Sequence, residues 1–94
     1  MTKLITGTFA GNGSSAELVA SGFTILAGSA TATNFGGGTL TAEVSHDGVN
    51  FTTAHSFTEE GAQTSIDYIG GVVVKLTLAG ATSPDLYYSV KYEG

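Results

Sequence analysis

Hydrophobic and polar residues alternate along most of the chain. In the stretch 72–78, Val72, Val74, Leu76 and Leu78 fall on one face and Lys75 on the other. The same period of two recurs at residues 86–92, 40–44, 23–27 and, on either side of Gly7, 5–9. A period of two with one apolar face is typical of antiparallel strands that are buried on one side. No segment has sustained helical periodicity, so the pattern predicts an all-β fold.

Glycine-rich turns separate these runs at intervals of roughly 8–12 residues, which is the spacing of sandwiches and barrels. We therefore predict one domain over residues 1–94, an antiparallel, jelly-roll-like β-sandwich of seven or eight short strands. The clearest turn is Ser45-His46-Asp47-Gly48-Val49-Asn50-Phe51. Asp47 suits a turn and Gly48 can adopt positive φ, so we expect a tight hairpin that joins 39–45 to 51–57. The segment 28–38 is interpreted as a strand that runs into a glycine bend.

The composition narrows the possible functions. The 94 residues include only three lysines and no arginine, against eight acidic residues, which gives a net charge of −5. Because phosphate backbones and anionic lipids require clustered basic residues, we expect no nucleic-acid or membrane partner. With no cysteine, disulfides and thiolate metal sites are impossible. The start of the chain lacks the apolar stretch of a secretory signal, so we expect synthesis in the cytoplasm without a signal peptide.

Candidate chemical groups are sparse. His46 in the turn and His55 on the next strand would lie too far apart to share a metal ion. His46 is interpreted as a solvated turn residue, and His55 as a structural histidine that is either partly buried or displaced by a bulge. The pair Glu59-Glu60 is interpreted as a solvated loop. Asp47 and Asn50 offer oxygens but lack the alternation of a calcium loop. The triplet 36–38 lacks the lysine and the helix of a phosphate-binding loop, so it indicates a bend or close backbone packing. We therefore predict no catalytic, cofactor or metal site, and no enzyme.

Protein contacts are the better prediction for the surface. Tyr87, Val73 and Leu26 lie on the outward phase of their strands, where apolar side chains often mark subunit interfaces. Tyr88 and Tyr92 share the phase of the apolar face, which indicates the core. An edge strand, either the N-terminal Leu4–Phe9 or the C-terminal Leu86–Tyr92, is expected to pair with a neighbour. The resulting set of candidate interface residues is Leu4, Ile5, Leu26, Val73, Tyr87 and Tyr92.

Two stretches, 35–51 and 71–86, together resemble a known family. They contain a Gly-Gly-Gly-Thr strand followed by a Ser-x-Asp-Gly-x-x-aromatic hairpin, and a late Leu-x-Gly-Ala-Thr-x-Pro turn. This combination is similar to small β-sandwich virion proteins of tailed bacteriophages. Family members often carry Trp at the position of Phe51 and Arg at that of Lys75. The hairpin alone also recurs in discoidin-like carbohydrate-binding jelly rolls, which are longer domains.

The resemblance implies a non-enzymatic structural protein on the surface of a phage capsid. The expected function is a decoration or cement subunit that binds the major capsid protein or another virion protein and stabilises the shell. A homo-oligomer is expected, a trimer first and a dimer second, because lattice symmetry favours it. The alternatives are a head-fibre or tail accessory protein and a carbohydrate-binding module.

Overall fold

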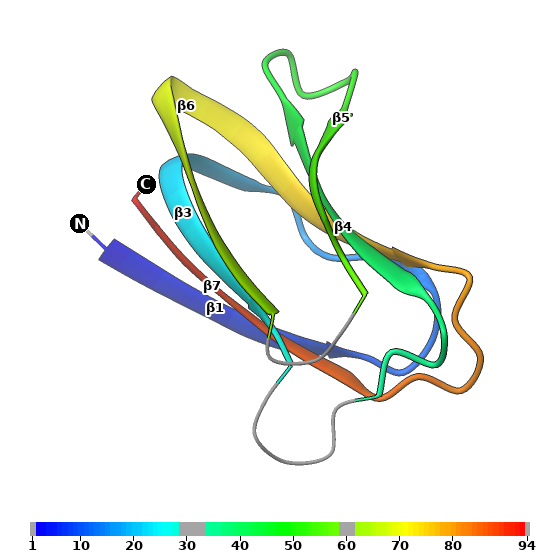
Figure 1. Ribbon diagram of the computed structural model, residues 1–94. Coiled ribbons are helices and arrows are strands. Elements are labelled where there is room, and N and C mark those ends of the chain that lie inside the picture. Colours follow the sequence, from blue (N-terminus) through cyan, green and yellow to red (C-terminus); the bar gives the residue numbers. More distant parts are fainter. Residues whose placement is uncertain (1, 29–33, 59–61, 94) are drawn as a thin grey trace.

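The computed structural model describes residues 2–28, 34–58 and 62–93, and in these ranges it contains seven strands and no helix (Figure 1). The prediction of an all-β, antiparallel, sandwich-like fold is confirmed. The predicted strand over Ala30 and Ala32 lies outside the described residues. The strands are β1 (Thr2–Phe9), β2 (Gly13–Ser14), β3 (Leu18–Ala27), β4 (Thr39–Ser45), β5 (Thr52–Phe57), β6 (Ala62–Ala79) and β7 (Leu86–Glu93).

One antiparallel sheet folds over on itself to make the two layers. Its strand order is β1-β7-β3-β6-β4-β5, with β2 paired beside β6. The first layer consists of β1, β7, the later part of β3 and the early part of β6, whose residues 62–67 pair with 22–27 of β3. The second layer consists of the start of β3, the later part of β6, β4 and β5, with β2 beside β6. β3 and β6 therefore belong to both layers.

β6 is 18 residues long, in contrast to the short strands that the glycine spacing predicts. Gly70 and Gly71, with φ of 86° and 85°, bend the strand, and its pairing with β3 stops after Asp67 and resumes at Val72. A non-glycine residue rarely adopts this left-handed conformation, so the glycine pair permits a corner between layers. β3 bends at the same level, where its pairing with β6 shifts register between Ala20 and Gly22.

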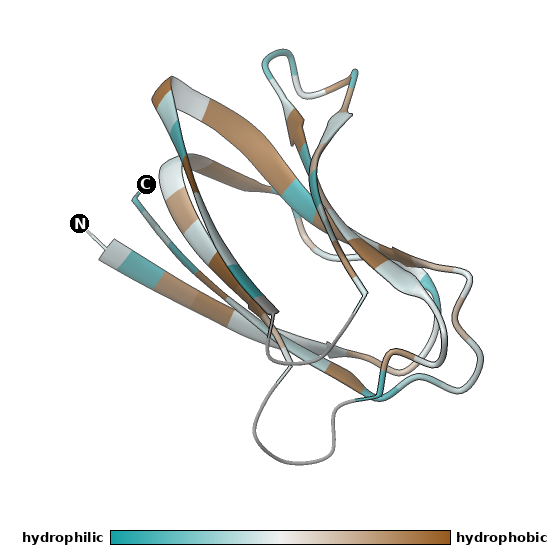
Figure 2. Ribbon diagram, in the orientation of Figure 1, coloured by the Kyte–Doolittle hydropathy of each residue, from teal (hydrophilic) through white to brown (hydrophobic). Residues whose placement is uncertain are grey.

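The core lies between the two layers and unites them. The buried residues include Phe23 and Ile25 of β3, Leu40 of β4, Leu76 of β6 and Leu86 of β7, and they form one continuous cluster. Figure 2 shows hydrophobic and hydrophilic positions in alternation along these strands. The apolar faces predicted from the period of two are therefore the faces that are buried.

Only one of the two predicted edge strands is an edge. Among the strands that the structure describes, β1 pairs with β7 alone, as expected for an edge. The prediction for the C-terminal strand is wrong, because β7 pairs with β1 on one side and with β3 on the other. Long-range pairing of this kind leaves no local signal in the sequence. β5 is a further edge strand, since within the described part of the chain it pairs only with β4.

Candidate interaction surfaces

The most exposed apolar side chains lie near the corner between the layers. Ile69 is fully exposed, with 102% relative accessibility, and Val19 is 69% exposed. Ile69 directly precedes the glycine pair of the bend, while Val19 lines a shallow groove of about 310 Å³ together with Gly70 and Gly71. We call Val19, Ile69, Gly70, Gly71 and Val73 the corner surface.

Val73 extends the corner surface along the second layer. It pairs directly with Val19, and its side chain lies 4.0 Å from the position that a Cβ on Gly48 would take. The β4–β5 turn therefore borders the corner surface, and Figure 1 shows this turn and the bend of β6 at the same end of the molecule. Val49 in that turn is 78% exposed. Apolar surface at this end is thus provided by three separate segments of the chain.

Three of the predicted interface residues share a different surface, the outer face of the first layer. Leu4 is 59% exposed on β1, and Leu26 and Tyr87 lie half-buried on the outward side of β3 and β7. Shallow grooves of about 290 Å³ and 130 Å³ cross this face, and Thr24 and Lys91 contribute to both. The larger groove is bordered mainly by polar groups, so this face is less apolar than the corner surface.

The remaining predicted interface residues lie apart from one another. Ile5 and Tyr92 are half-buried and pack against the core from the inner side of the first layer. Val73 is half-buried on the outside of the second layer, in the corner surface. The structure therefore does not unite the six residues in one patch.

Sequence reasoning missed Ile69, Val19 and Val49. Ile69 carried a usable signal, because Ile66 and Tyr68 pack against the core and Ile69 breaks their period of two immediately before two glycines. An apolar residue out of phase at a glycine bend is a candidate for exposure.

The carboxylate of Asp47 accepts several hydrogen bonds within the β4–β5 turn. The backbone N–H groups of Asn50 and Val49 each donate to Oδ1 of Asp47 at 2.8 Å, and the Asn50 side chain donates to Oδ2 at 2.8 Å. The buried Ser45 hydroxyl also donates to Oδ1 at 2.8 Å. These bonds, led by the one from the Asn50 backbone, hold the pKa of Asp47 well below its usual range. Asp47 thus stabilises the predicted hairpin, which is confirmed.

Neither histidine contributes to a cluster of metal ligands. His46 is exposed in the turn, with its ring 6.3 Å from that of Tyr68, and His55 is exposed beside Phe57. A register shift between Ala42 and Glu43 displaces His55 from the buried phase, as one of the two interpretations anticipated. No group of three or more metal-ligating residues occurs within residues 2–28, 34–58 and 62–93. Glu59 and Glu60 lie outside the described residues.

The glycine triplet packs against the β6–β7 loop, which confirms the prediction of close backbone packing. Gly36 accepts a 2.9 Å hydrogen bond from the Thr82 N–H and has φ of 62°. A Cβ on Gly36 would lie 2.4 Å from the Thr82 carbonyl oxygen. Close packing therefore explains Gly36 and Gly38, and the bend explains Gly37, which has φ of 78° and open space around it.

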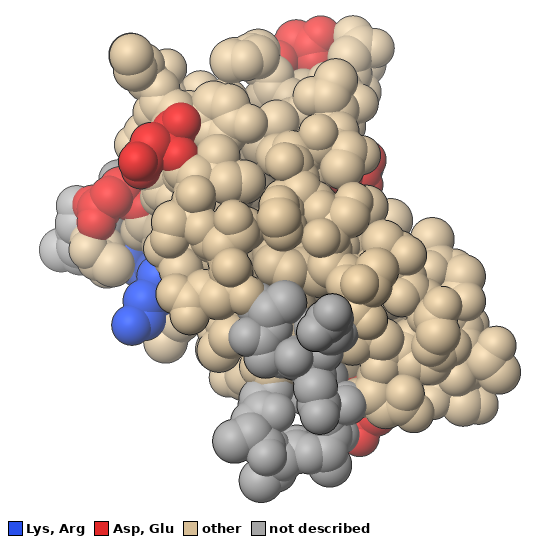
Figure 3. Space-filling view, in the orientation of Figure 1, with Lys and Arg blue, Asp and Glu red and all other residues tan. Residues whose placement is uncertain are grey.

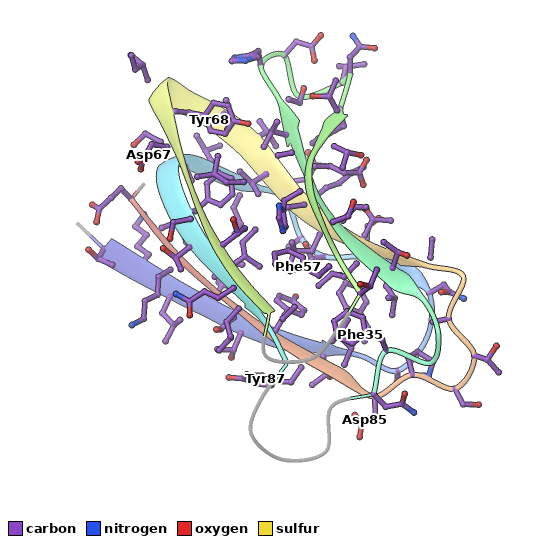
Figure 4. All side chains as sticks on the ribbon, viewed as in Figure 1. Phe35, Phe57, Asp67, Tyr68, Asp85 and Tyr87 are labelled. Carbon is purple, nitrogen blue, oxygen red and sulfur yellow. The ribbon has the colours of Figure 1, made fainter. Side chains whose placement is uncertain are left out.

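Charged side chains are few and scattered over the face seen in Figure 3. Glu93 at the end of β7 accepts a hydrogen bond from the Thr2 hydroxyl, which is the main reason that its pKa is lowered. Figure 4 shows Tyr87 at the side of the first layer, well separated from Tyr68 near the bend of β6. The tyrosines therefore do not form one aromatic platform.

Comparisons of this chain with protein-family models, curated proteins and solved structures found no match. The part of the chain that the structure describes contains no helix with the length and hydropathy needed to cross a membrane.

Proposed function

We propose that this protein is a non-enzymatic structural subunit of a phage virion, a capsid decoration protein that binds the shell through its corner surface. The observation that carries the proposal is the exposure of Ile69 and Val19 beside an open groove at the corner. The proposal also rests on the resemblance of the 35–51 and 71–86 stretches to virion proteins of this kind.

Burial of these two side chains would provide much of the binding energy. Removing a large aliphatic side chain from water contributes about 1.5–3 kcal/mol. The two glycines extend the contact along the groove, and Val73 extends it beside Val19, with which it pairs. Exposed apolar side chains that are grouped in this way are typical of protein contacts.

A bound subunit would stabilise the shell by spanning a joint between capsid subunits. Each added contact must be broken before the shell opens, so heat resistance increases with occupancy. The unpaired edge of β1 provides a second site for contact with a neighbouring copy. A trimer that matches a three-fold position of the lattice is the preferred assembly, and a dimer is the second.

Binding of purified protein to undecorated phage heads tests the proposal. We expect the wild-type chain to co-sediment with the heads and to raise the temperature at which they release DNA. Ile69→Asp should reduce binding by at least roughly tenfold. The variant loses the favourable burial of an apolar side chain and instead has to bury a charged carboxylate, which is unfavourable. Leu4→Asp makes the same change on the other candidate contact surface, because Leu4 is also exposed but lies on β1.

The possible outcomes test the decoration function and the position of the contact surface separately. If wild-type protein neither binds heads nor raises their heat resistance, the decoration function is wrong. Binding that is lost in Leu4→Asp and retained in Ile69→Asp would instead place the contact on the outer face of the first layer. Binding to purified tails alone would identify a tail accessory protein.

A further inference from the structure

The side chain of Asn12 ties together two loops that are distant in sequence. Asn12 lies between β1 and β2, and its Nδ2 donates to the Ala81 carbonyl at 3.0 Å. The Ala81 N–H in turn donates to Oδ1 of Asn12 at 2.9 Å. The amide thus forms a two-bond clasp with the backbone of the β6–β7 loop.

The residue that follows Asn12 makes its amide chemically reactive. Gly13 has no side chain to shield its backbone nitrogen, and no atom lies within 4 Å of the place where a Cβ would stand. Asn12 and Gly13 are both exposed. Asn12-Gly13 is the only Asn-Gly pair in the sequence, whereas Asn34 and Asn50 are each followed by phenylalanine. Attack by the backbone nitrogen is therefore least hindered at Asn12.

We propose that Asn12 is a site of spontaneous deamidation and that the reaction opens the clasp. The deprotonated nitrogen of Gly13 bonds to Cγ of Asn12, and the Cγ–Nδ2 bond breaks with release of ammonia. The product of this step is a five-membered succinimide. Water then adds to one of the two ring carbonyls and opens the ring. Cleavage at the side-chain carbonyl leaves aspartate, and cleavage at the backbone carbonyl leaves isoaspartate.

The folded structure lowers the rate of this deamidation. Both polar atoms of the Asn12 side chain are engaged by Ala81, so the side chain must leave the clasp before Cγ can turn toward Gly13. Gly13 is also paired opposite Leu78 in the β2–β6 ladder. The reaction therefore requires local opening of the loop and is slower in the folded chain than in the unfolded chain.

The product cannot restore the clasp. A carboxylate at position 12 still accepts from the Ala81 N–H, but its second oxygen carries no hydrogen and faces the Ala81 carbonyl. Two acceptors in contact repel each other, and a polar contact that is lost in this way is unfavourable. Isoaspartate also adds a backbone methylene just before β2. Deamidation is thus an irreversible, age-dependent loosening of the contact between the two loops.

Peptide mapping by mass spectrometry tests the reaction. Full-length chain is incubated at neutral and at mildly alkaline pH, once folded and once in denaturant. We expect deamidation and isoaspartate at Asn12, faster at higher pH, and at least roughly tenfold slower in the folded chain. Asn34 and Asn50 should remain intact over the same period. Equal rates in folded and unfolded chain would show that the clasp does not restrain the reaction, and an unmodified Asn12 in denaturant would refute the site.

Thermal unfolding of Asn12→Asp tests the consequence. We expect its midpoint to fall by several degrees, on the order of 5 °C. Gln63→Glu is the matched control, because it makes the same amide-to-acid change at an exposed position of β6, and its midpoint should remain near that of the wild type. If Asn12→Asp is as stable as Gln63→Glu, the product does not open the clasp and the second half of the proposal is wrong.

Discussion

Three consecutive glycines, residues 36–38, form the turn before β4. Alanine at each position separates the cost of a left-handed backbone from the cost of a steric clash. Gly36 has φ of 62° and a Cβ there would lie 2.4 Å from the Thr82 carbonyl oxygen. Gly37 has φ of 78°, but a Cβ there would meet nothing within 4 Å. Gly38 does not have positive φ, and a Cβ there would lie 2.8 Å from the Ala79 carbonyl oxygen. Gly36 therefore tests both costs together, Gly37 tests the conformational cost alone and Gly38 tests the steric cost alone.

The magnitudes follow from these differences. Left-handed backbone costs alanine about 1–2 kcal/mol, and forcing an extra methyl group into a packed site costs about 1–3 kcal/mol. Gly37→Ala should therefore lower the free energy of unfolding by about 1–2 kcal/mol, Gly38→Ala by about 1–3 kcal/mol and Gly36→Ala by the sum, about 2–5 kcal/mol. Gly36→Ala also displaces Thr82, whose N–H donates to Gly36.

Thermal and urea unfolding of the three variants measure this order. For a domain of this size, 1 kcal/mol corresponds to a change in midpoint of about 4–8 °C. We expect Gly36→Ala to be the least stable of the three by a clear margin. If Gly37→Ala is as destabilising as Gly36→Ala, the contact with Thr82 contributes nothing, and the packing interpretation of the triplet is refuted.

Two further predictions concern the turn and the first layer. Because the folded pKa of Asp47 is depressed, its contribution to stability is present above the unfolded pKa of about 3.9 and is lost only as the pH falls well below it. The amide shifts of Val49 and Asn50, followed by NMR, should stay constant from neutral pH to about pH 4 and change below it; a midpoint near or above 3.9 contradicts the hydrogen-bonded turn. Gly7→Ala should lower stability by about 1–3 kcal/mol, since its Cβ would lie 2.5 Å from the buried Tyr88 hydroxyl. Gly11→Ala, with open space around its Cβ, is the comparison for Gly7→Ala in thermal unfolding, and equal stability of the two would exclude a steric role for Tyr88.

The parts of the fold that local chemistry determines could be predicted from the sequence. The period of two identified the buried faces of β3, β4 and β7 and of the later part of β6. Asp47 and Gly48 identified the hairpin, because the turn is closed by bonds among its own residues. The sequence also indicates a bend or close backbone packing at the glycine triplet, since the lysine and the helix of a phosphate-binding loop are both missing.

The pairing of distant strands could not be predicted. The glycine spacing predicts a break between strands at Gly70-Gly71, whereas β6 continues through the pair and contacts β3 on both sides of it. The early part of β6 is an edge strand with polar residues such as Gln63 and Ser65, so its sequence resembles a loop. The break of phase at Ile69 marks it as a candidate for exposure, but its neighbours in the corner surface depend on the direction of that bend, which only the folded chain reveals.

A cryo-electron microscopy map of the virion that contains this protein tests the central claim most directly. The account predicts density for the sandwich on the outer surface of the capsid, with Ile69 and Val19 buried against a shell subunit. A map in which the sandwich is absent from the particle, or is attached with the corner surface facing solvent, would contradict it.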